Sequence, residues 1–261
     1  MINVSLAPGE IVVGSRRIAF RRREGAGPGL VWLPGFKSDM DSTKAGALDA
    51  HAAAAGRALL RFDYSGHGVS GGRFEDGTIG QWLEDALAVI RAQSKGPQVL
   101  VGSSMGGWLA LLAARALAAS GEEERLAGMV LIAPAVDFTQ ELMWERFSPE
   151  LRDELATTGQ WLRPSAHGGT FAITMRLIAE ARDHLLFGQP IRSFCPVHIL
   201  QGMQDPDVPW QHAMQLVEHL ASDPVAITLI KDGDHRLSRA DDISRLLAAV
   251  DAMASPAAAS N

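Results

Sequence analysis

The sequence contains little cysteine and no surplus of basic residues. Its single cysteine, Cys195, cannot form a disulfide within the chain, which fits a reducing compartment. Lysine and arginine total 24 against 30 aspartate and glutamate residues, so the formal net charge is −6. This balance argues against a nucleic-acid partner, because binding to phosphate backbones requires an excess of positive charge.

Long apolar runs and targeting signals are also missing. No uninterrupted apolar stretch approaches the roughly 20 residues that span a bilayer. The opening MINVSLAPGE has neither the basic and apolar regions of a secretory signal nor the Arg- and Ser-rich composition of a transit peptide. We therefore expect no membrane span and a cytoplasmic location.

What is present is the composition of an ordinary globular protein, with 261 residues of which 47% are hydrophobic and 21% charged. Short apolar runs alternate with longer helical patterns. Strands are expected at 11–13, 17–21, 30–33, 58–62, 98–101, 129–132, 197–200 and 226–230, and helices at 44–56, 79–92, 105–119, 211–220 and 240–253. This alternation predicts a mostly parallel twisted sheet covered by helices on both faces.

One segment interrupts the alternation. Residues 137–193 show no convincing strand and carry several aromatic side chains among many Arg and Glu residues. An insertion of this length predicts a helical cap on a core made of residues 1–136 and 194–253. Trp144, Phe147 and Trp161 are candidate substrate-binding residues, with packing of the cap onto the core as the alternative. The Ala- and Ser-rich residues 254–261 are expected to form a disordered tail.

A strand-to-helix junction carries the pattern Gly-x-Ser-x-Gly, with Ser104 between Gly102 and Gly106. The pattern is typical of a nucleophile elbow, in which a sharp turn exposes the serine hydroxyl. The positions two before and two after the serine must be small for this turn to close. Centring the pattern on Ser103 would place a valine and a methionine there, so Ser104 is the predicted nucleophile.

A serine nucleophile needs a base, and the base needs an acid to orient it. In nucleophile-elbow enzymes both follow the serine along the chain. His235 follows the last predicted strand and is the predicted base. Asp205 follows the preceding strand and is the predicted acid, with Asp207 on the same loop and Asp137 after strand 129–132 as alternatives.

The oxyanion of an acyl-transfer intermediate requires fixed N–H donors. One is expected from Met105, the residue after the nucleophile. The other is expected from Phe36, because Gly35 lets the backbone turn tightly after strand 30–33.

These residues resemble a known family. RFDYSGHGVS at 61–70 resembles the D-x-x-G-x-G-x-S stretch that α/β hydrolases carry after their fourth strand. Further matches are GFKSDM at 35–40, VGSSMGGW at 101–108, WLRPS at 161–165, GMQDPDVPW at 202–210 and DHR at 234–236. In order and spacing these resemble the α/β-hydrolase-domain-containing member ten group, which are mitochondrial palmitoyl-protein thioesterases that also hydrolyse acyl-glucuronides.

The resemblance covers residues 33–236 and implies the α/β-hydrolase fold with Ser104, Asp205 and His235 as a catalytic triad. It also implies an oxyanion hole formed by Phe36 and Met105. Two positions depart from the group, which usually has histidine where Pro34 and Gln201 stand. The opening residues do not resemble a mitochondrial presequence, so we expect a bacterial-type relative whose physiological substrate can differ from that of the group.

The expected activity is hydrolysis of an ester or thioester through an acyl-enzyme on Ser104, acting on a small molecule or an acylated protein. The histidines show no H-x-x-x-H pair, so neither a metal nor an organic cofactor is expected. Cations of the cap are candidates to meet a polar or anionic leaving group: Arg146, Arg152, Arg163 and His167. The alternatives are a C–C hydrolase, peptidase or lipase with the same triad, or a non-catalytic binding module. Nothing in the sequence indicates the oligomeric state.

Overall fold

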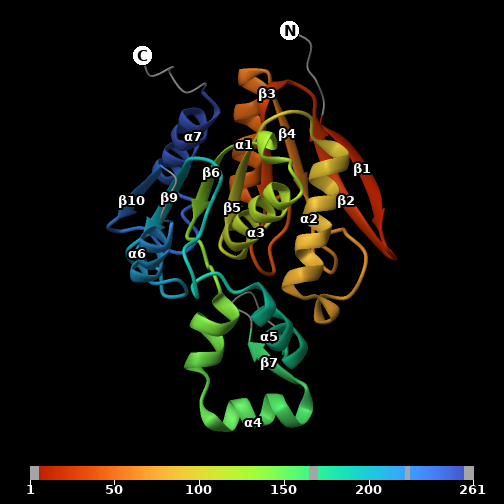
Figure 1. Cartoon of the computed structure of the whole chain (residues 1–261), viewed down its shortest axis with the longest axis vertical. Helices are drawn as coiled ribbons and strands as arrows, with labels where there is room; N and C mark the ends of the chain where they lie inside the picture. Colours follow the sequence, from red (N-terminus) through yellow and green to blue (C-terminus); the bar gives the residue numbers. More distant parts are fainter. Residues whose placement is uncertain (1–5, 165–169, 221–223, 256–261) are drawn as a thin grey trace.

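The computed structural model describes residues 6–164, 170–220 and 224–255. An eight-stranded sheet runs through the molecule (Figure 1). The strand order is β1-β2-β4-β3-β5-β6-β9-β10. The β1–β2 and β2–β4 pairs are antiparallel, and all other neighbouring pairs are parallel. The strands are β1 (Ala7–Val13), β2 (Arg16–Arg23), β3 (Ala26–Leu33), β4 (Arg57–Phe62), β5 (Gln98–Ser103), β6 (Leu126–Ile132), β9 (Val197–Gly202) and β10 (Val225–Ile230). The predicted mostly parallel sheet is confirmed.

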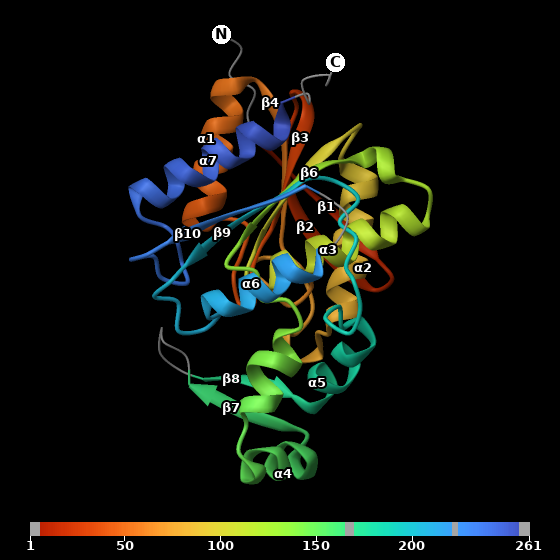
Figure 2. The same cartoon turned by 60° about the vertical axis from the view of Figure 1, so that its left-hand side comes forward.

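Helices cover both faces of this sheet, as Figure 2 shows. Along β3, Leu30 and Trp32 pack into one hydrophobic cluster while Val31 and Leu33 pack into the other, because successive strand residues point to opposite faces. The first cluster includes residues of α1 (Thr43–Ala55) and α7 (Ala240–Ala254). The second includes residues of α2 (Ile79–Gln93), α3 (Met105–Ala119) and α6 (Trp210–His219). Short 3₁₀ helices occur at η1 (Phe74–Asp76) and η2 (Glu123–Arg125).

The cap is built from the segment between β6 and β9 and lies beyond one end of the sheet (Figure 1). Its elements are η3 (Thr139–Met143), η4 (Trp144–Arg146), α4 (Pro149–Thr158), β7 (Gln160–Pro164), β8 (Thr170–Thr174), α5 (Met175–Ala181) and η5 (Arg182–His184). The expectation of a purely helical cap is wrong, since β7 and β8 form a separate antiparallel sheet. Each strand has only five residues, too few for a clear alternation of apolar and polar positions.

Side-chain hydrogen bonds close the base of the cap and join the cap to the core. The carboxylate of Asp137, just after β6, accepts from the N–H groups of Leu186 and Phe187 at 2.8 Å each. On α5, Glu180 accepts from the N–H of Gly80 in α2 at 3.0 Å. The first and last segments of the cap are therefore held together, and α5 is held to α2 of the core.

The described helices include none that is long and apolar enough to cross a membrane. The helix α7 extends to Ala254, one residue into the predicted tail. Residues 256–261 lie outside the described residues, as does His167, so the predictions made for them stay predictions.

Candidate active site

Ser104 occupies a sharp turn between β5 and α3. Its backbone has φ 55° and ψ −119°, a left-handed conformation that residues with a side chain rarely adopt. A Cβ on Gly102 would lie 2.3 Å from the carbonyl oxygen of Gly106. A Cβ on Gly106 would lie 2.0 Å from the carbonyl oxygen of Leu33. Only glycine fits at both positions, which is the steric condition that the sequence pattern predicts.

The side chain of Ser104 is the accessible one of the two neighbouring serines. Ser104 is half-buried, whereas Ser103 at the end of β5 is buried. In the described part of the chain, Ser104 Oγ has no hydrogen-bond partner. Catalytic hydrogen bonds often tighten only in the substrate complex, so a hydroxyl without a partner is compatible with a nucleophile.

Backbone hydrogen bonds connect the carboxyl ends of four adjacent strands. The N–H of Ser104 donates to the carbonyl of Ile132 at the end of β6, at 2.8 Å. The N–H of Ala133 donates to Leu200 in β9, at 2.8 Å, and that of Met203 donates to Ile230 in β10, at 2.9 Å. The loops that follow β5, β9 and β10 therefore share one edge of the sheet.

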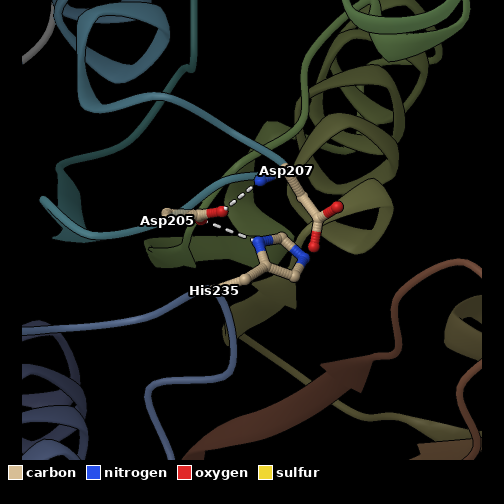
Figure 3. Close-up of side chains that lie close together, drawn as sticks. All are labelled: Asp205, Asp207 and His235. Atoms are coloured by element: carbon tan, nitrogen blue, oxygen red, sulfur yellow. Dashed lines mark hydrogen bonds and ion pairs between the residues drawn. The ribbon is translucent and has the colours of Figure 1, made fainter. Parts of the chain in front are cut away.

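Asp205 and His235 come together at this edge, from the loops after β9 and β10 (Figure 3). Nδ1 of His235 lies 2.7 Å from Oδ2 of Asp205. Because a carboxylate only accepts hydrogen bonds, Nδ1 must be the donor, which leaves Nε2 free to take a proton. The Asp205 side chain is fully buried, and the His235 side chain is 25% exposed.

The Asp205 carboxylate is held by its own loop. Oδ1 accepts from the N–H groups of Asp207 at 2.9 Å and Val208 at 2.8 Å. Nε2 of Gln201, at the end of β9, donates to the carbonyl of Val208 at 3.0 Å and lies 3.4 Å from Asp205 Oδ2. These bonds fix the Asp205 carboxylate in place, and Gln201, which departs from the family pattern, takes part in them.

The two alternative acids lie in other surroundings. Asp207 is exposed, and only its backbone N–H is bonded to Asp205. Asp137 is buried and accepts from the N–H groups of Leu186 and Phe187. Burial raises the pKa of Asp137 to about 6. His235 thus donates its hydrogen bond to Asp205, while Asp137 joins the first and last segments of the cap.

The predicted oxyanion-hole residues lie on two segments that touch. A Cβ on Gly35 would be 3.3 Å from Cβ of Ser104, so the loop after β3 passes directly beside the serine. Phe36 follows on this loop, and Met105 is the first residue of α3. The first N–H groups of a helix have no partner within it, so the Met105 N–H is available to a ligand.

The ring of Phe36 is the centre of an aromatic cluster that joins the core to the cap. Its centroid lies 4.9 Å from Phe74, 5.5 Å from Phe138 and 6.0 Å from Phe171 on β8. In the sequence, Phe138 and Phe171 are only two of several aromatic residues in the cap segment. Their contact with Phe36 depends on tertiary packing, and no local sequence pattern predicts this contact.

The three predicted substrate-binding aromatics lie within the cap and are half-buried. Phe147 and Trp161 form an edge-to-face pair with centroids 5.5 Å apart. Trp144 is contacted by the guanidinium groups of Arg152 at 5.3 Å and Arg182 at 5.2 Å. The structure thus brings two of the three together, and their role in binding substrate stays a prediction.

One group of potential metal ligands occurs among the described residues. Asp205, Asp207 and His235 each offer one ligand atom, and these atoms lie within 4.8 Å of one another. Two of the three are already joined by the hydrogen bond between His235 and Asp205. The expectation that the chain needs no metal stays a prediction.

His67, on the loop after β4, is a buried histidine with no catalytic contact. Its ring packs edge-on against Tyr64, Phe74 and Trp82. It is 4% exposed, and its Nε2 has no partner among the described residues. Burial lowers the pKa of His67 to about 4.

We expect His67 to make the fold sensitive to acid. The unfolded chain protonates this histidine near its ordinary pKa of 6.5, whereas the folded chain does so only near 4. Its contribution to stability is therefore complete above pH 6.5 and is lost as the pH falls toward 4. At pH 5 the loss is about 2 kcal/mol. His67→Phe should reduce the drop in unfolding free energy between pH 7.5 and pH 5 by about this amount in urea titrations.

His212 provides an internal reference for this experiment. Burial lowers its pKa to about 4 as well, so part of the acid sensitivity should persist in the His67→Phe variant. If the unfolding free energy fell equally in the wild type and the variant between pH 7.5 and pH 5, His67 would not be held neutral in the folded chain.

A mostly parallel sheet, a serine in a strained strand–turn–helix and an Asp–His pair at the same sheet edge define the α/β-hydrolase class. The chain belongs to this family: the model described as "Alpha/beta hydrolase family" matches residues 28–249. The fold class and the resemblance predicted from the sequence are both confirmed.

Known relatives place the chain within a narrower group. It is 38% identical to mouse mitochondrial palmitoyl-protein thioesterase ABHD10 over 238 residues, which cover 90% of this chain and 77% of that one. The human protein of the same name is 37% identical over 236 residues, which cover 90% of this chain and 75% of the human one. Because these relatives are named as mitochondrial, the cytoplasmic location expected from the sequence stays a prediction.

Solved structures agree with this placement. A hydrolase from Agrobacterium vitis S4 has 46% identity and a TM-score of 0.90, covering 96% of this chain and 99% of that one. Mouse α/β hydrolase domain-containing protein 10 has 35% identity and a TM-score of 0.86, and the match covers 95% of this chain and 98% of the mouse chain. The match therefore includes the cap as well as the core.

Proposed function

We propose that this chain is a serine hydrolase that cleaves thioesters and carboxylic esters through an acyl-enzyme on Ser104. The observation that carries the proposal is the buried Asp205 carboxylate 2.7 Å from His235, at the sheet edge that also bears the strained Ser104 turn. Asp205 and His235 are the proposed acid and base. Three residue types with complementary roles on three separate loops are what nucleophilic acyl transfer requires.

In the first step, Ser104 Oγ attacks the carbonyl carbon of the substrate while Nε2 of His235 takes the hydroxyl proton. The buried Asp205 holds the imidazole through Nδ1 and stabilises the imidazolium that forms. The carbonyl oxygen becomes negatively charged and accepts hydrogen bonds from the N–H groups of Phe36 and Met105. The imidazolium then gives its proton to the leaving thiolate or alkoxide, and the acyl group stays on Ser104.

In the second step, water attacks the acyl-enzyme. His235 takes a proton from the water and returns it to Ser104 Oγ, which releases the carboxylic acid. Every group used in this cycle is a side chain or backbone N–H of the chain, and no bond change requires a metal or an organic cofactor.

The acyl group is proposed to be apolar. The Phe36 donor carries a ring in contact with Phe74, Phe138 and Phe171, so the oxyanion loop is continuous with an aromatic surface. Phe147 and Trp161 extend the aromatic surface of the cap, and Trp144 is the third proposed substrate-binding residue. Relatives named palmitoyl-protein thioesterases support a long apolar acyl chain on a thioester, from a small molecule or an acylated protein.

A matched substrate panel tests this function. Thioesters and p-nitrophenyl esters with acyl chains from acetyl to palmitoyl should be hydrolysed, with kcat/KM rising with chain length because each buried methylene adds about 0.8 kcal/mol of binding. Turnover of a C–C bond or a peptide instead would retain the triad and change the substrate class. A folded wild-type protein that hydrolyses none of these esters would overturn the proposal and favour a binding module.

A further inference from the structure

One carboxylate beside His235 has no part in the catalytic cycle. A carboxylate oxygen of Asp207, a ring nitrogen of His235 and a carboxylate oxygen of Asp205 all lie within 4.8 Å of one another. In Figure 3 the Asp207 carboxylate lies next to the ring nitrogen that Asp205 does not hold, which is Nε2. The negative charge of Asp207 therefore lies beside the imidazole without a direct hydrogen bond to it among the described residues.

The position of Asp207 is fixed by its loop. Its N–H donates to Asp205 Oδ1 at 2.9 Å, and the next residue, Val208, is 2% exposed and donates to the same oxygen at 2.8 Å. Pro206 and Pro209 flank this pair and restrict the backbone. The backbone of Asp207 is therefore held beside the His235 loop, which keeps its side chain in this part of the site.

No ion pair within the described residues neutralises Asp207. The charged neighbours of His235 face elsewhere: the carbonyl of Arg236 accepts from Lys44 on α1, and the guanidinium of Arg236 lies near the same lysine. Asp234 accepts from the N–H of Leu237 at 2.9 Å. Lys37, on the loop of Phe36, lies over the rings of Phe74 and Phe171. The charged group that Figure 3 shows beside the imidazole, apart from Asp205, is Asp207.

We propose that Asp207 selects substrates by the charge of the leaving group, favouring cationic and neutral thiols or alcohols over anionic ones. This inference rests on the proposed function, in which Nε2 of His235 delivers a proton to the leaving atom. That atom must come within hydrogen-bond reach of Nε2, and so within a few ångströms of the Asp207 carboxylate. At about 6 Å in a water-like medium, one unit of leaving-group charge changes kcat/KM by about three- to tenfold.

The sequence suggests the opposite preference, because the cap contains several arginines that could attract an anion. Arg152 donates to the carbonyl of Trp144 at 3.0 Å and to that of Glu145 at 3.2 Å. Arg182 lies against the Trp144 ring. Arg152 and Arg182 are thus engaged within the cap, whereas the Asp207 carboxylate lies beside the imidazole of His235.

Three thioesters with the same butyryl group test the proposal. Butyrylthiocholine has a cationic leaving group, S-(3,3-dimethylbutyl) thiobutyrate is its neutral isostere, and S-butyryl-3-mercaptopropionate is anionic. For the wild type, kcat/KM should fall in this order. In Asp207→Asn, the ratio of kcat/KM for the cationic thioester to that for the neutral one should fall by about three- to tenfold. The ratio of kcat/KM for the neutral thioester to that for the anionic one should fall by a similar factor.

Two controls separate a local charge effect from a general one. Glu218→Gln on α6 makes the same change in net charge at an exposed position and should leave both ratios unchanged. Raising the salt from about 10 mM to about 500 mM should reduce the ratios of the wild type and have little effect on those of Asp207→Asn.

The outcomes distinguish this inference from the proposed function. Ser104-dependent hydrolysis of the neutral thioester with ratios that Asp207→Asn does not change would overturn the role of Asp207 alone. A wild-type preference for the anionic thioester would overturn it as well and would favour the cap arginines. Failure of the wild type to hydrolyse any of the three would overturn the proposed function together with the inference.

Discussion

Replacing Ser104 with alanine is expected to lower kcat for ester and thioester hydrolysis by about 10⁴-fold or more. The loss is this large because the alanine side chain cannot form the acyl-enzyme, and the remaining groups supply only oxyanion binding and substrate positioning. Steady-state kinetics with p-nitrophenyl butyrate measure the effect. The fold should persist, since the φ of 55° at this position is a strain that alanine shares with serine.

Ser103→Ala is the matched control for this variant. Ser103 is the last residue of β5, is buried, and precedes the turn that exposes the neighbouring hydroxyl. This variant should keep most of the wild-type kcat. If Ser103→Ala were inactive and Ser104→Ala active, the register of the elbow would be wrong by one residue.

Asp205→Asn is expected to lower kcat by about 10³- to 10⁴-fold. Asparagine retains an oxygen that can accept from the N–H groups of Asp207 and Val208, so the loop should keep its shape. Its amide nitrogen would face Nδ1 of His235, however, and would stabilise the tautomer that carries its proton on Nε2. That tautomer cannot act as a base toward Ser104. Activity and the midpoint of thermal unfolding should be measured on the same preparation.

The comparison with Asp207→Asn makes this prediction specific. The Asp207 carboxylate is not hydrogen-bonded to the imidazole. Removing its charge should therefore reduce kcat for a neutral ester far less than removing the charge of Asp205. A larger defect in Asp207→Asn than in Asp205→Asn would transfer the acid role to Asp207. Equal small defects would mean that His235 is oriented by other groups.

The parts of the site that the sequence predicts are those governed by local sterics and strand order. Gly102 and Gly106 flank Ser104 because a Cβ at either position would collide with backbone, and this requirement is visible in five residues. The placement of Asp205 and His235 follows from parallel strands, whose carboxyl ends meet at one edge. Neither inference needs knowledge of distant packing.

Other features depend on contacts between residues far apart in the chain. Asp137 looked like a possible acid because it follows a core strand, yet its carboxylate bonds to N–H groups 49 and 50 residues later. The β7–β8 pair was missed because two strands of five residues carry too little periodicity. The ring contact between Phe36 and Phe171 spans the core and the cap, and only the folded chain brings the two together.

Labelling with a fluorophosphonate, followed by peptide mass spectrometry of the adduct, asks whether Ser104 is the nucleophile of an acyl-transfer enzyme. We expect one phosphonyl adduct on Ser104 in the wild type and in Ser103→Ala, and none in Ser104→Ala. An adduct on Ser103 or on another serine, or no adduct on the folded wild-type protein, would contradict this expectation.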